Sequence, residues 1–243
     1  MSLTSINCEH IAPALWGENT FQNLQRQEVH LWRIDLRIAY QKLSKLEKLL
    51  SYEERKRAAN YLQEKDRIRF ILGHACVKDL ISRYLDIDVA QVSLNKGANG
   101  KPYISPVHKL YFNISHSGDW VLIAFGSEEL GVDLENITGD FITDPLMAQC
   151  FHENEIKVIR TSDDPTAEFF KFWTRKEAFL KATGNGMVDE LNQFTCMNAF
   201  QEFEFPSLSN KKNWYLKSFL MDNNYAVSLC APSPLNTILF LNY

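Results

Sequence analysis

Long apolar segments are missing from this chain of 243 residues. Its longest apolar runs, at residues 121–125 and 237–241, are far shorter than the roughly 20 residues that a membrane-spanning helix requires. The N-terminal residues also lack the basic start and apolar block of a secretory signal, and no arginine-rich transit segment follows. We therefore expect a cytoplasmic protein with no membrane partner, in which the apolar runs are buried strands.

Cysteine motifs and a strong net charge are missing too. The five cysteines are scattered without a C-x-x-C pair, which argues against a disulfide framework or a zinc site, so we expect reduced and mostly buried thiols. The formal net charge is only −4, whereas a general nucleic-acid binder normally carries a basic face. We therefore expect no nucleic-acid partner, although a local basic patch is compatible with this charge.

Clear helix signals occur at three places. Ser51 and Glu54 form a capping box, because each side chain can satisfy the other residue's free backbone N–H. Apolar residues recur at helical spacing over residues 65–85. A third helix is predicted over 167–183, and Gly184 follows it at a position where glycine commonly ends a helix.

Strand signals surround these helices. Residues 28–36 alternate apolar and polar side chains until the phase shifts at Ile34, where the predicted strand ends or bulges. Two apolar segments flank the polar turn at 116–119 and predict a β-hairpin. The remaining predictions are a strand passing into a loop over 91–103, a strand over 131–137, mixed helical segments over 144–161, and strands over 193–205, 214–221, 225–230 and 237–241.

The order of these elements predicts an α+β fold with antiparallel or mixed sheets. The chain is long enough for two fused halves of roughly 120 residues each. Two similar halves joined near residue 128 fit the order, so we expect an N-terminal half over 1–128 and a C-terminal half over 129–243. The sequence contains no clear internal repeat and no low-complexity linker that would mark the junction.

Asp133 and Glu135 are candidate metal ligands. Side chains alternate between the two faces of a strand, so these carboxylates point the same way while Val132 and Leu134 point into a core. Two carboxylates on one edge suit a hard divalent cation. The alternative is an ordinary half-exposed strand whose acids face solvent.

A third acid lies beside a positive charge on the helix predicted over 167–183. Residues four apart share a helix face, so Trp173, Glu177 and Lys181 form one stripe. The alternative is a surface ion pair worth a few tenths of a kcal/mol. Because phenylalanine and leucine side chains surround the stripe, we expect a mostly buried helix whose charges need partners.

Basic residues elsewhere are candidates for phosphate contacts. His116 lies in the predicted hairpin between two serines, and Lys101 lies in a loop whose glycines permit close backbone approach. Arg57 and Arg69 belong to the preceding helical segments. Taken singly, such residues are more commonly a hydrogen-bonded structural histidine, an exposed loop lysine and helix-surface charges.

Four motifs, in order along the chain, resemble those of the 4′-phosphopantetheinyl transferases. The resemblance is to the larger monomeric type that serves peptide synthetases, polyketide synthases and other carrier proteins. The family's marks are a G-K-P loop, F-N-[IL]-S-H-S, G-[IV]-D-[IVL]-E and W-[ST]-x-K-E-[AS]-x-x-K-x-x-G-x-G. They stand here at residues 100–102, 112–117, 131–135 and 173–186, with no departure at the core positions.

This resemblance implies a fold and a reaction. The fold would be two similar α+β halves related by a pseudo-twofold axis, with coenzyme A and Mg²⁺ bound in the cleft between them, in a monomer. The reaction would transfer the 4′-phosphopantetheine arm of coenzyme A to a serine of an apo acyl or peptidyl carrier protein. Its products would be holo carrier protein and adenosine 3′,5′-bisphosphate.

The resemblance also assigns roles to the candidate residues. The metal ligands would be Asp133, Glu135 and Glu177. Glu177 would in addition act as general base, directly or through a water molecule, and Lys181 would stabilise charge on the pyrophosphate. The residues that would bind coenzyme A are Arg57, Arg69, Lys101, Pro102, Ser115, His116 and Lys181.

Two other function classes stay open on the sequence alone. A noncatalytic module that binds coenzyme A or a carrier protein would be marked by loss of Asp133, Glu177 or Lys181, and all three are present. A magnesium-dependent phosphohydrolase or nuclease also uses clustered acids, but it would release its product without a carrier protein. The sequence does not identify the carrier.

Overall fold

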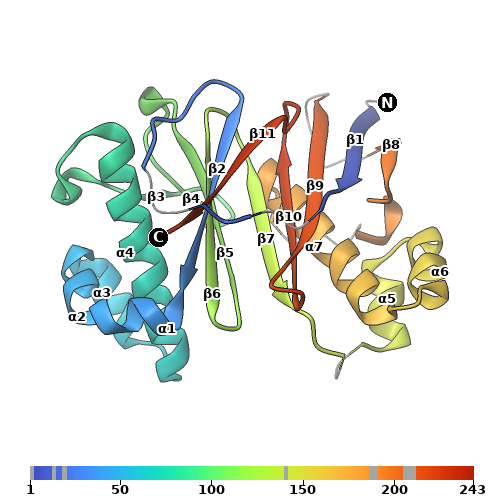
Figure 1. Ribbon diagram of the computed structural model, residues 1–243, viewed down its shortest axis with the longest axis horizontal. Helices are drawn as coiled ribbons and strands as arrows, with labels where there is room; N and C mark the ends of the chain where they lie inside the picture. Colours follow the sequence, from blue (N-terminus) through green and yellow to red (C-terminus); the bar gives the residue numbers. More distant parts are fainter. Residues whose placement is uncertain (1–2, 13–14, 18–20, 140–141, 187–190, 205–211) are drawn as a thin grey trace.

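Two β-sheets lie between outer layers of helices (Figure 1). The structure is a computed structural model, and it describes residues 3–12, 15–17, 21–139, 142–186, 191–204 and 212–243. The four-stranded sheet has the order β11 (Thr237–Asn242), β2 (Glu28–Asp35), β6 (Trp120–Gly126) and β5 (Tyr111–Ser117). The five-stranded sheet has the order β7 (Gly131–Asn136), β10 (Tyr225–Ala231), β9 (Asn213–Met221), β1 (Leu3–His10) and β8 (Ala199–Glu204).

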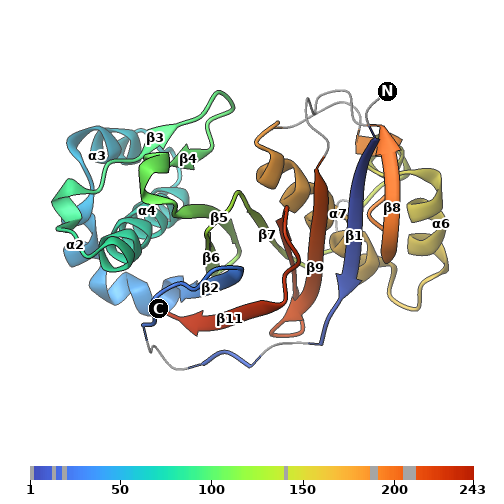
Figure 2. The same cartoon turned by 90° about the horizontal axis from the view of Figure 1, so that it is seen from above.

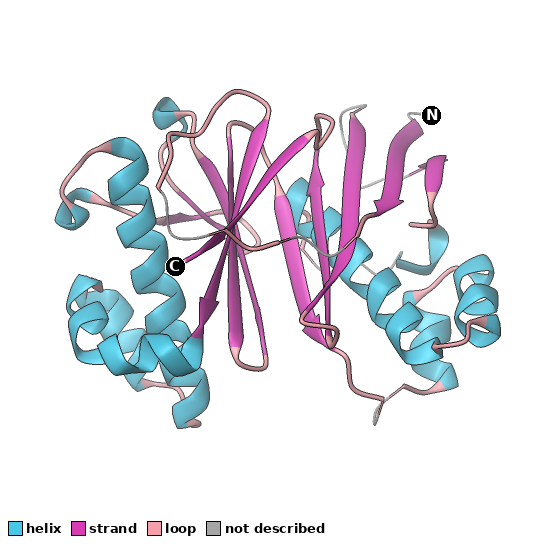
Figure 3. Cartoon of the chain, viewed as in Figure 1, coloured by secondary structure: helices cyan, strands magenta, loops and turns pink. Residues whose placement is uncertain are grey.

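The helices form one group outside each sheet, as the secondary-structure colouring of Figure 3 shows. The four-stranded sheet is accompanied by α1 (Leu36–Ala39), α2 (Leu43–Leu46), α3 (Tyr52–Ala59) and α4 (Glu64–Leu85). The five-stranded sheet is accompanied by α5 (Asp144–Cys150), α6 (Glu153–Thr161) and α7 (Pro165–Thr183). Both sheets contain parallel and antiparallel pairs, which confirms the predicted α+β fold with mixed sheets.

The apolar run in β6 shows why the two sheets stack. Val121, Ile123 and Phe125 belong to the core cluster that includes α4, whereas Leu122 and Ala124 belong to the cluster that includes β7 and β10. All five side chains are fully buried. Alternation therefore directs one face of the four-stranded sheet to a helix and the other to the five-stranded sheet, so an uninterrupted apolar run is stable there.

The first and last strands of the chain lie in the sheets of the opposite halves. β1, at the N-terminal end, belongs to the five-stranded sheet, and β11, at the C-terminal end, belongs to the four-stranded sheet. β1 pairs with β8 and β9, while β11 pairs with β2, so the two terminal strands lie in different halves of the molecule (Figure 1). The division predicted near residue 128 falls between β6 and β7 and stays a prediction. Any such division has to include this exchange of terminal strands, which the sequence did not indicate.

Most of the helix predictions are confirmed. The capping box is present, since the Ser51 backbone N–H donates to Glu54 Oε2 (2.7 Å) and the Glu54 N–H donates to Ser51 Oγ (3.2 Å). The helix predicted over 65–85 is α4. Gly184 ends α7 in the left-handed region with φ of 74°, as glycine permits. The mixed segment over 144–161 forms two helices, α5 and α6, of which the second is capped by the side chain of His152.

Some strand predictions differ from the structure. The segment 91–103 contains only the two-residue strands β3 (Asn95–Lys96) and β4 (Pro102–Tyr103) around a loop. The strand predicted over 193–205 begins later, at Ala199, and residue 205 lies outside the described residues. β1 and the short helices before residue 50 were not predicted. All five cysteines are free and buried, as expected, and no helix in the described ranges is long and apolar enough to span a membrane.

Figure 2 shows the two sheets meeting where β5 lies beside β7. These two edge strands belong to different sheets, and side chains of β5 contact the backbone of β7 across the gap. The three donors are backbone N–H groups of alternate β7 residues, and the acceptors are side-chain oxygens of alternate β5 residues. The bonds are Val132 N–H to Asn113 Oδ1 (2.8 Å), Leu134 N–H to Ser115 Oγ (3.2 Å) and Asn136 N–H to Ser117 Oγ (2.9 Å).

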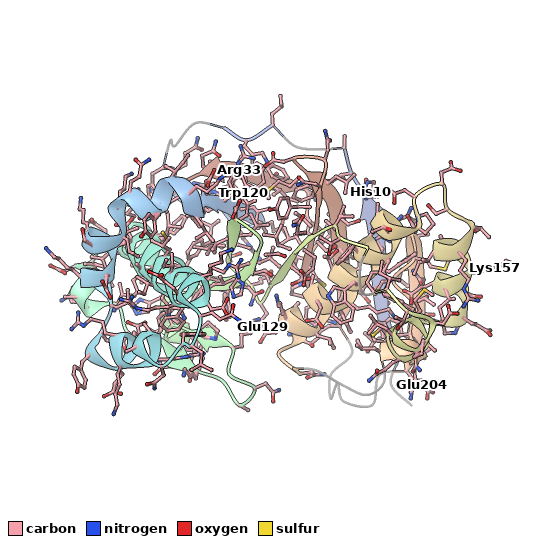
Figure 4. The ribbon with its side chains drawn as sticks, turned by 90° about the horizontal axis from the view of Figure 1, so that it is seen from below. His10, Arg33, Trp120, Glu129, Lys157 and Glu204 are labelled. Atoms are coloured by element: carbon pink, nitrogen blue, oxygen red, sulfur yellow. The ribbon has the colours of Figure 1, made fainter. Side chains whose placement is uncertain are left out.

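Arg33 on β2 makes a second connection between the sheets. Its guanidinium carbon lies 4.6 Å from the ring centroid of Trp16 and 5.0 Å from that of Trp120, and Figure 4 shows Arg33 and Trp120 next to each other. Arg33 also donates to Asp222 Oδ1 (3.2 Å), in the turn between β9 and β10, and to Asn242 Oδ1 (2.7 Å) on β11. Stacking on two rings and pairing with a carboxylate hold this arginine in one position.

Gly131 allows α7 to lie directly against β7. A Cβ atom at this position would lie 2.1 Å from the Ala178 carbonyl oxygen and 2.4 Å from the Ala182 backbone nitrogen. These are backbone atoms, so relief of the overlap requires a shift of the whole helix. The glycine that opens the G-V-D-L-E motif is thus required by packing.

We expect Gly131→Ala to lower the free energy of unfolding by about 1–3 kcal/mol, the usual cost of overpacking, as measured by chemical denaturation. Gly73→Ala is the matched control, because Gly73 is also buried but its added Cβ would make only an ordinary contact, 3.8 Å from Val121 Cγ1. Within a helix this exchange stabilises by up to about 1 kcal/mol. Equal losses in the two variants would contradict the role given to Gly131.

Candidate active site

Asp133 on β7 lies at the centre of the candidate site and is only 3% exposed. Its Oδ1 accepts hydrogen bonds from Ser115 Oγ (2.9 Å) and Lys181 Nζ (2.7 Å). Its Oδ2 is buried and has no hydrogen-bond partner among the described residues. An unpaired buried carboxylate oxygen is costly unless a donor or a cation meets it.

Glu135 and Glu177 are the other two acids of the site. Glu135 Oε2 accepts a hydrogen bond from Ser117 Oγ (3.0 Å), whereas Glu177 Oε1 is buried without a partner in the described part of the chain. Burial and then the negative charge of Asp133 raise the pKa of both glutamates. Their carboxylate forms therefore gain from any positive charge placed between them.

The predicted stripe on α7 is present. Trp173, Glu177 and Lys181 are partly exposed, and every other residue from 172 to 180 is buried. The Lys181 ammonium pairs with Asp133 and also donates to Ser115 Oγ (3.1 Å). The alternative of a surface pair between Glu177 and Lys181 does not describe this geometry, because the lysine's carboxylate partner is Asp133 on the neighbouring strand.

The acids fit a magnesium ion by their chemistry. No group of three or more His, Cys, Asp or Glu side chains in the described ranges is already arranged as a metal cluster. Mg²⁺, however, is commonly held by one or two carboxylates together with water and substrate phosphate oxygens. Asp133 Oδ2 and Glu177 Oε1, both buried and unpaired among the described residues, are the oxygens that would gain most from such a cation. Glu135 is the third candidate ligand.

A pocket of about 310 Å³ is lined entirely by residues of the N-terminal half. It brings together three of the predicted coenzyme A residues that carry or can carry positive charge, Arg57, Arg69 and His116, with Pro102 in its wall. Lys96, at the end of the short strand β3, also lines it and was missed, because a single exposed lysine gives no signal in the sequence. The pocket is thus basic although the whole protein is slightly acidic.

The three predicted basic residues of this pocket differ in how free they are. Arg69 donates to the Gly118 carbonyl oxygen (3.0 Å) and to Asp66 Oδ1 (3.1 Å), so part of its guanidinium is engaged. Arg57 is exposed, with its guanidinium carbon 4.9 Å from the Phe70 ring centroid. Burial and then the charges of Lys181 and Arg69 lower the pKa of His116, which favours the neutral form of its ring.

The side chains of Lys101 and Ser115 form hydrogen bonds within the protein. Lys101 Nζ donates to the carbonyl oxygens of Leu130 (2.9 Å) and Lys181 (2.5 Å), and burial lowers its pKa to about 8. Ser115 is buried between Asp133 and Lys181. Neither side chain lines the pocket described above, so their contacts with coenzyme A stay predictions. The structure shows Lys101 hydrogen-bonded to Leu130 and to α7, and Ser115 hydrogen-bonded to β7 and α7.

Comparison with known proteins assigns the chain to a family. Residues 129–230 match the model of the 4′-phosphopantetheinyl transferase superfamily, and residues 38–128 match the model of the 4′-phosphopantetheinyl transferase N-terminal region. The 4′-phosphopantetheinyl transferase HetI of Nostoc sp. is 31% identical over 83% of this chain and 86% of its own length. The chain belongs to the 4′-phosphopantetheinyl transferase superfamily.

Two further relatives agree with this membership. The 4′-phosphopantetheinyl transferase Sfp of Bacillus subtilis is 29% identical over 76% of this chain and 83% of its own length. A putative 4′-phosphopantetheinyl transferase of Synechocystis sp. is 32% identical over 70% of this chain and 72% of its own length. These matches confirm the resemblance drawn from the four motifs, including the larger type, and they make the chain an enzyme of this class. A noncatalytic module and a phosphohydrolase are thereby set aside.

Two further charged residues of α7 are buried in this transferase, and the sequence analysis assigned no role to either, although one of them belongs to the motif over residues 173–186. Arg175 donates to Ser218 Oγ (2.9 and 3.0 Å) and to the Cys196 carbonyl oxygen (2.6 Å). Lys176 pairs with Glu155 Oε2 (2.8 Å), and both side chains are at most 1% exposed. The same helix therefore has catalytic candidates on one face and buried ionic anchors on the other.

We expect Lys176→Met to lower the free energy of unfolding by about 3–5 kcal/mol, because it leaves Glu155 buried without its counter-charge. Chemical denaturation measures the change. Lys171→Met is the matched control on the same helix, since its pair with Glu168 lies nearer the surface and such pairs are worth at most about 1 kcal/mol. A loss in Lys176→Met no larger than that in the control would show that the buried pair is not an anchor.

Proposed function

We propose that this transferase moves the 4′-phosphopantetheine arm from coenzyme A to a serine of an apo acyl or peptidyl carrier protein. The products are the holo carrier protein and adenosine 3′,5′-bisphosphate, and Mg²⁺ is required. The main support is one juxtaposition. Two buried, unpaired oxygens among the described residues, Asp133 Oδ2 and Glu177 Oε1, lie in the site where Lys181 pairs with Asp133. The pocket lined by Arg57, Arg69 and Lys96 reaches β5 at His116, whose neighbours Ser115 and Ser117 are hydrogen-bonded to Asp133 and Glu135.

The reaction is one substitution at phosphorus. The carrier's serine oxygen forms a bond to the β-phosphorus of coenzyme A, and the bond from that phosphorus to the bridging pyrophosphate oxygen breaks. The bridging oxygen leaves with the electron pair on adenosine 3′,5′-bisphosphate. Glu177, whose Oε1 is buried and has no hydrogen-bond partner among the described residues, accepts the proton of the serine hydroxyl.

Positive charge at fixed positions lowers the barrier most, because charge builds up on the nonbridging and leaving oxygens. Lys181 supplies one such charge, and its contacts with Asp133 and Ser115 hold it in place. Mg²⁺, held by Asp133, Glu135 and Glu177, would supply further positive charge to the pyrophosphate oxygens. Coenzyme A would place its adenosine phosphates against Arg57, His116 and Lys96, and Arg69 would contribute the part of its guanidinium that is free.

A carrier-free reaction separates transfer from hydrolysis. Incubation with coenzyme A and Mg²⁺ alone should leave coenzyme A intact, and addition of an apo carrier protein should give a mass gain of one phosphopantetheine arm. Release of adenosine 3′,5′-bisphosphate without a carrier would overturn the proposal. Mass measurement over candidate apo carriers also identifies the acceptor. The monomeric state, the pseudo-twofold relation and a cytoplasmic location stay predictions.

We expect Glu177→Gln to reduce the rate of carrier labelling by about 10² or more, since a positioned general base contributes about 10²–10⁴ and the variant also weakens a metal ligand. The assay follows the carrier's mass shift at saturating coenzyme A. Glu168→Gln is the matched control, because Glu168 lies on the same helix but pairs with Lys171 outside the site. Its rate should remain within about twofold of the unaltered enzyme. Unchanged labelling by Glu177→Gln would reject the role of Glu177.

Arg57→Ala should weaken coenzyme A binding by roughly tenfold, because a charge-assisted contact to phosphate is worth about 1.5–3 kcal/mol. Isothermal titration with coenzyme A measures it, and the melting temperature should hardly change since Arg57 is exposed. Arg67→Ala is the control, because Arg67 pairs with Glu47 and does not line the pocket. Equal weakening in both variants would point to a general loss of surface charge and not to a phosphate contact.

A further inference from the structure

The two serines of the β5 motif make the same pair of contacts with β7. Ser115 donates to the Asp133 carboxylate (2.9 Å) and accepts from the N–H of the next residue, Leu134 (3.2 Å). Ser117 donates to the Glu135 carboxylate (3.0 Å) and accepts from the N–H of the next residue along the strand (2.9 Å). A serine hydroxyl has one proton to donate, so in each case that proton is committed to a candidate metal ligand.

We propose that Ser117 is a positioning residue of the metal site, which holds the Glu135 carboxylate in place relative to β7 as Ser115 holds that of Asp133. This inference rests on the proposed magnesium site. Metal-binding carboxylates are commonly oriented by hydrogen bonds from residues that do not touch the metal. Neither the motif nor the family comparison assigns such a role to Ser117.

Glu135 has more need of this contact than Asp133. A glutamate side chain has one more rotatable bond than an aspartate, so fixing its carboxylate costs more conformational entropy. Asp133 is held by Lys181 as well as by Ser115. Glu135 accepts from Ser117 Oγ (3.0 Å) and from the side chain of Trp173 on α7. Of these two contacts, Ser117 supplies the one that ties the carboxylate to β5. Loss of the Ser117 hydroxyl should therefore leave the Glu135 carboxylate with fewer contacts and more freedom to take other rotamers.

The backbone around Ser117 is itself held in place. The next residue, Gly118, starts the turn between β5 and β6 with φ of 56°, and its carbonyl oxygen accepts from Arg69 Nε (3.2 Å) and Nη2 (3.0 Å). A Cβ at Gly118 would lie 2.4 Å from the Tyr225 hydroxyl oxygen. The Ser117 hydroxyl thus starts from a fixed turn, as a residue that positions a ligand requires.

Asn113 provides a natural comparison at the start of the same series. Its Oδ1 accepts from the Val132 N–H (2.8 Å), as the serine oxygens accept from β7. The β7 residue that precedes Val132 is Gly131, which has no carboxylate. Asn113 therefore accepts a backbone hydrogen bond from β7 but makes no hydrogen bond with a candidate metal ligand among the described residues. Its loss should weaken the contact between the two sheets and leave the candidate ligands oriented.

The test is a titration of Mn²⁺, used in place of Mg²⁺, into the full-length protein, followed by the electron paramagnetic resonance signal of the free ion. Each protein is measured alone and with one equivalent of coenzyme A. We expect Ser117→Ala to weaken Mn²⁺ binding by about tenfold, the lower end of the effect for residues that orient metal ligands. Ser117→Thr keeps the hydroxyl and should bind within about threefold of the unaltered protein.

Two controls separate orientation from stability. Asn113→Ala should lower the melting temperature but leave Mn²⁺ affinity within about twofold, and Glu135→Gln should weaken Mn²⁺ binding at least as much as Ser117→Ala. The role of Ser117 would be overturned if Ser117→Ala bound Mn²⁺ normally, or if Asn113→Ala weakened Mn²⁺ binding as much as Ser117→Ala does. Either result would leave the proposed metal site itself unaffected. If the unaltered protein bound no Mn²⁺ with or without coenzyme A, the magnesium site itself, and with it this inference, would be rejected.

Discussion

The contact between β5 and β7 is the constraint on which the site depends. Each strand uses one backbone edge inside its own sheet, and alternate polar side chains of β5 satisfy the N–H groups on the free edge of β7. A slip of one residue would turn Ile114 and His116 toward those N–H groups, because side chains alternate along a strand. The register that joins the sheets therefore also sets where Asp133 and Glu135 stand.

The second constraint is the close approach of α7 to β7. The absence of a side chain at Gly131 allows helix backbone to lie where a Cβ would be, and Lys101 adds donors to the carbonyl oxygens of Leu130 and Lys181. A positive charge at the C-terminal end of a helix is favourable. On the far face, the buried contacts of Lys176 fix the same helix. Glu177 therefore reaches the acids of β7 from a helix held on both sides.

Sequence reasoning predicted what local rules determine. The capping box at Ser51, the apolar run in β6 and the terminal Gly184 each depend on near neighbours along the chain, and the structure has all three. It could not predict that β1 joins the five-stranded sheet and β11 the four-stranded sheet, because each of these strands pairs with residues far away in the sequence. It also left the side-chain direction of Lys101 open, since only the packing of its loop on α7 decides whether the ammonium group meets backbone carbonyl oxygens or solvent.

The same packing explains why a cation would stabilise the acids of this site. Burial between β7 and α7 raises the pKa of Glu135 on β7 and of Glu177 on α7, while the ammonium group of Lys181 is paired with Asp133. The two buried oxygens left without partners among the described residues belong to Asp133 on β7 and Glu177 on α7. A divalent ion bound by both would join helix to strand, so its affinity must depend on the contacts that hold α7 against β7, and not only on the ligands themselves.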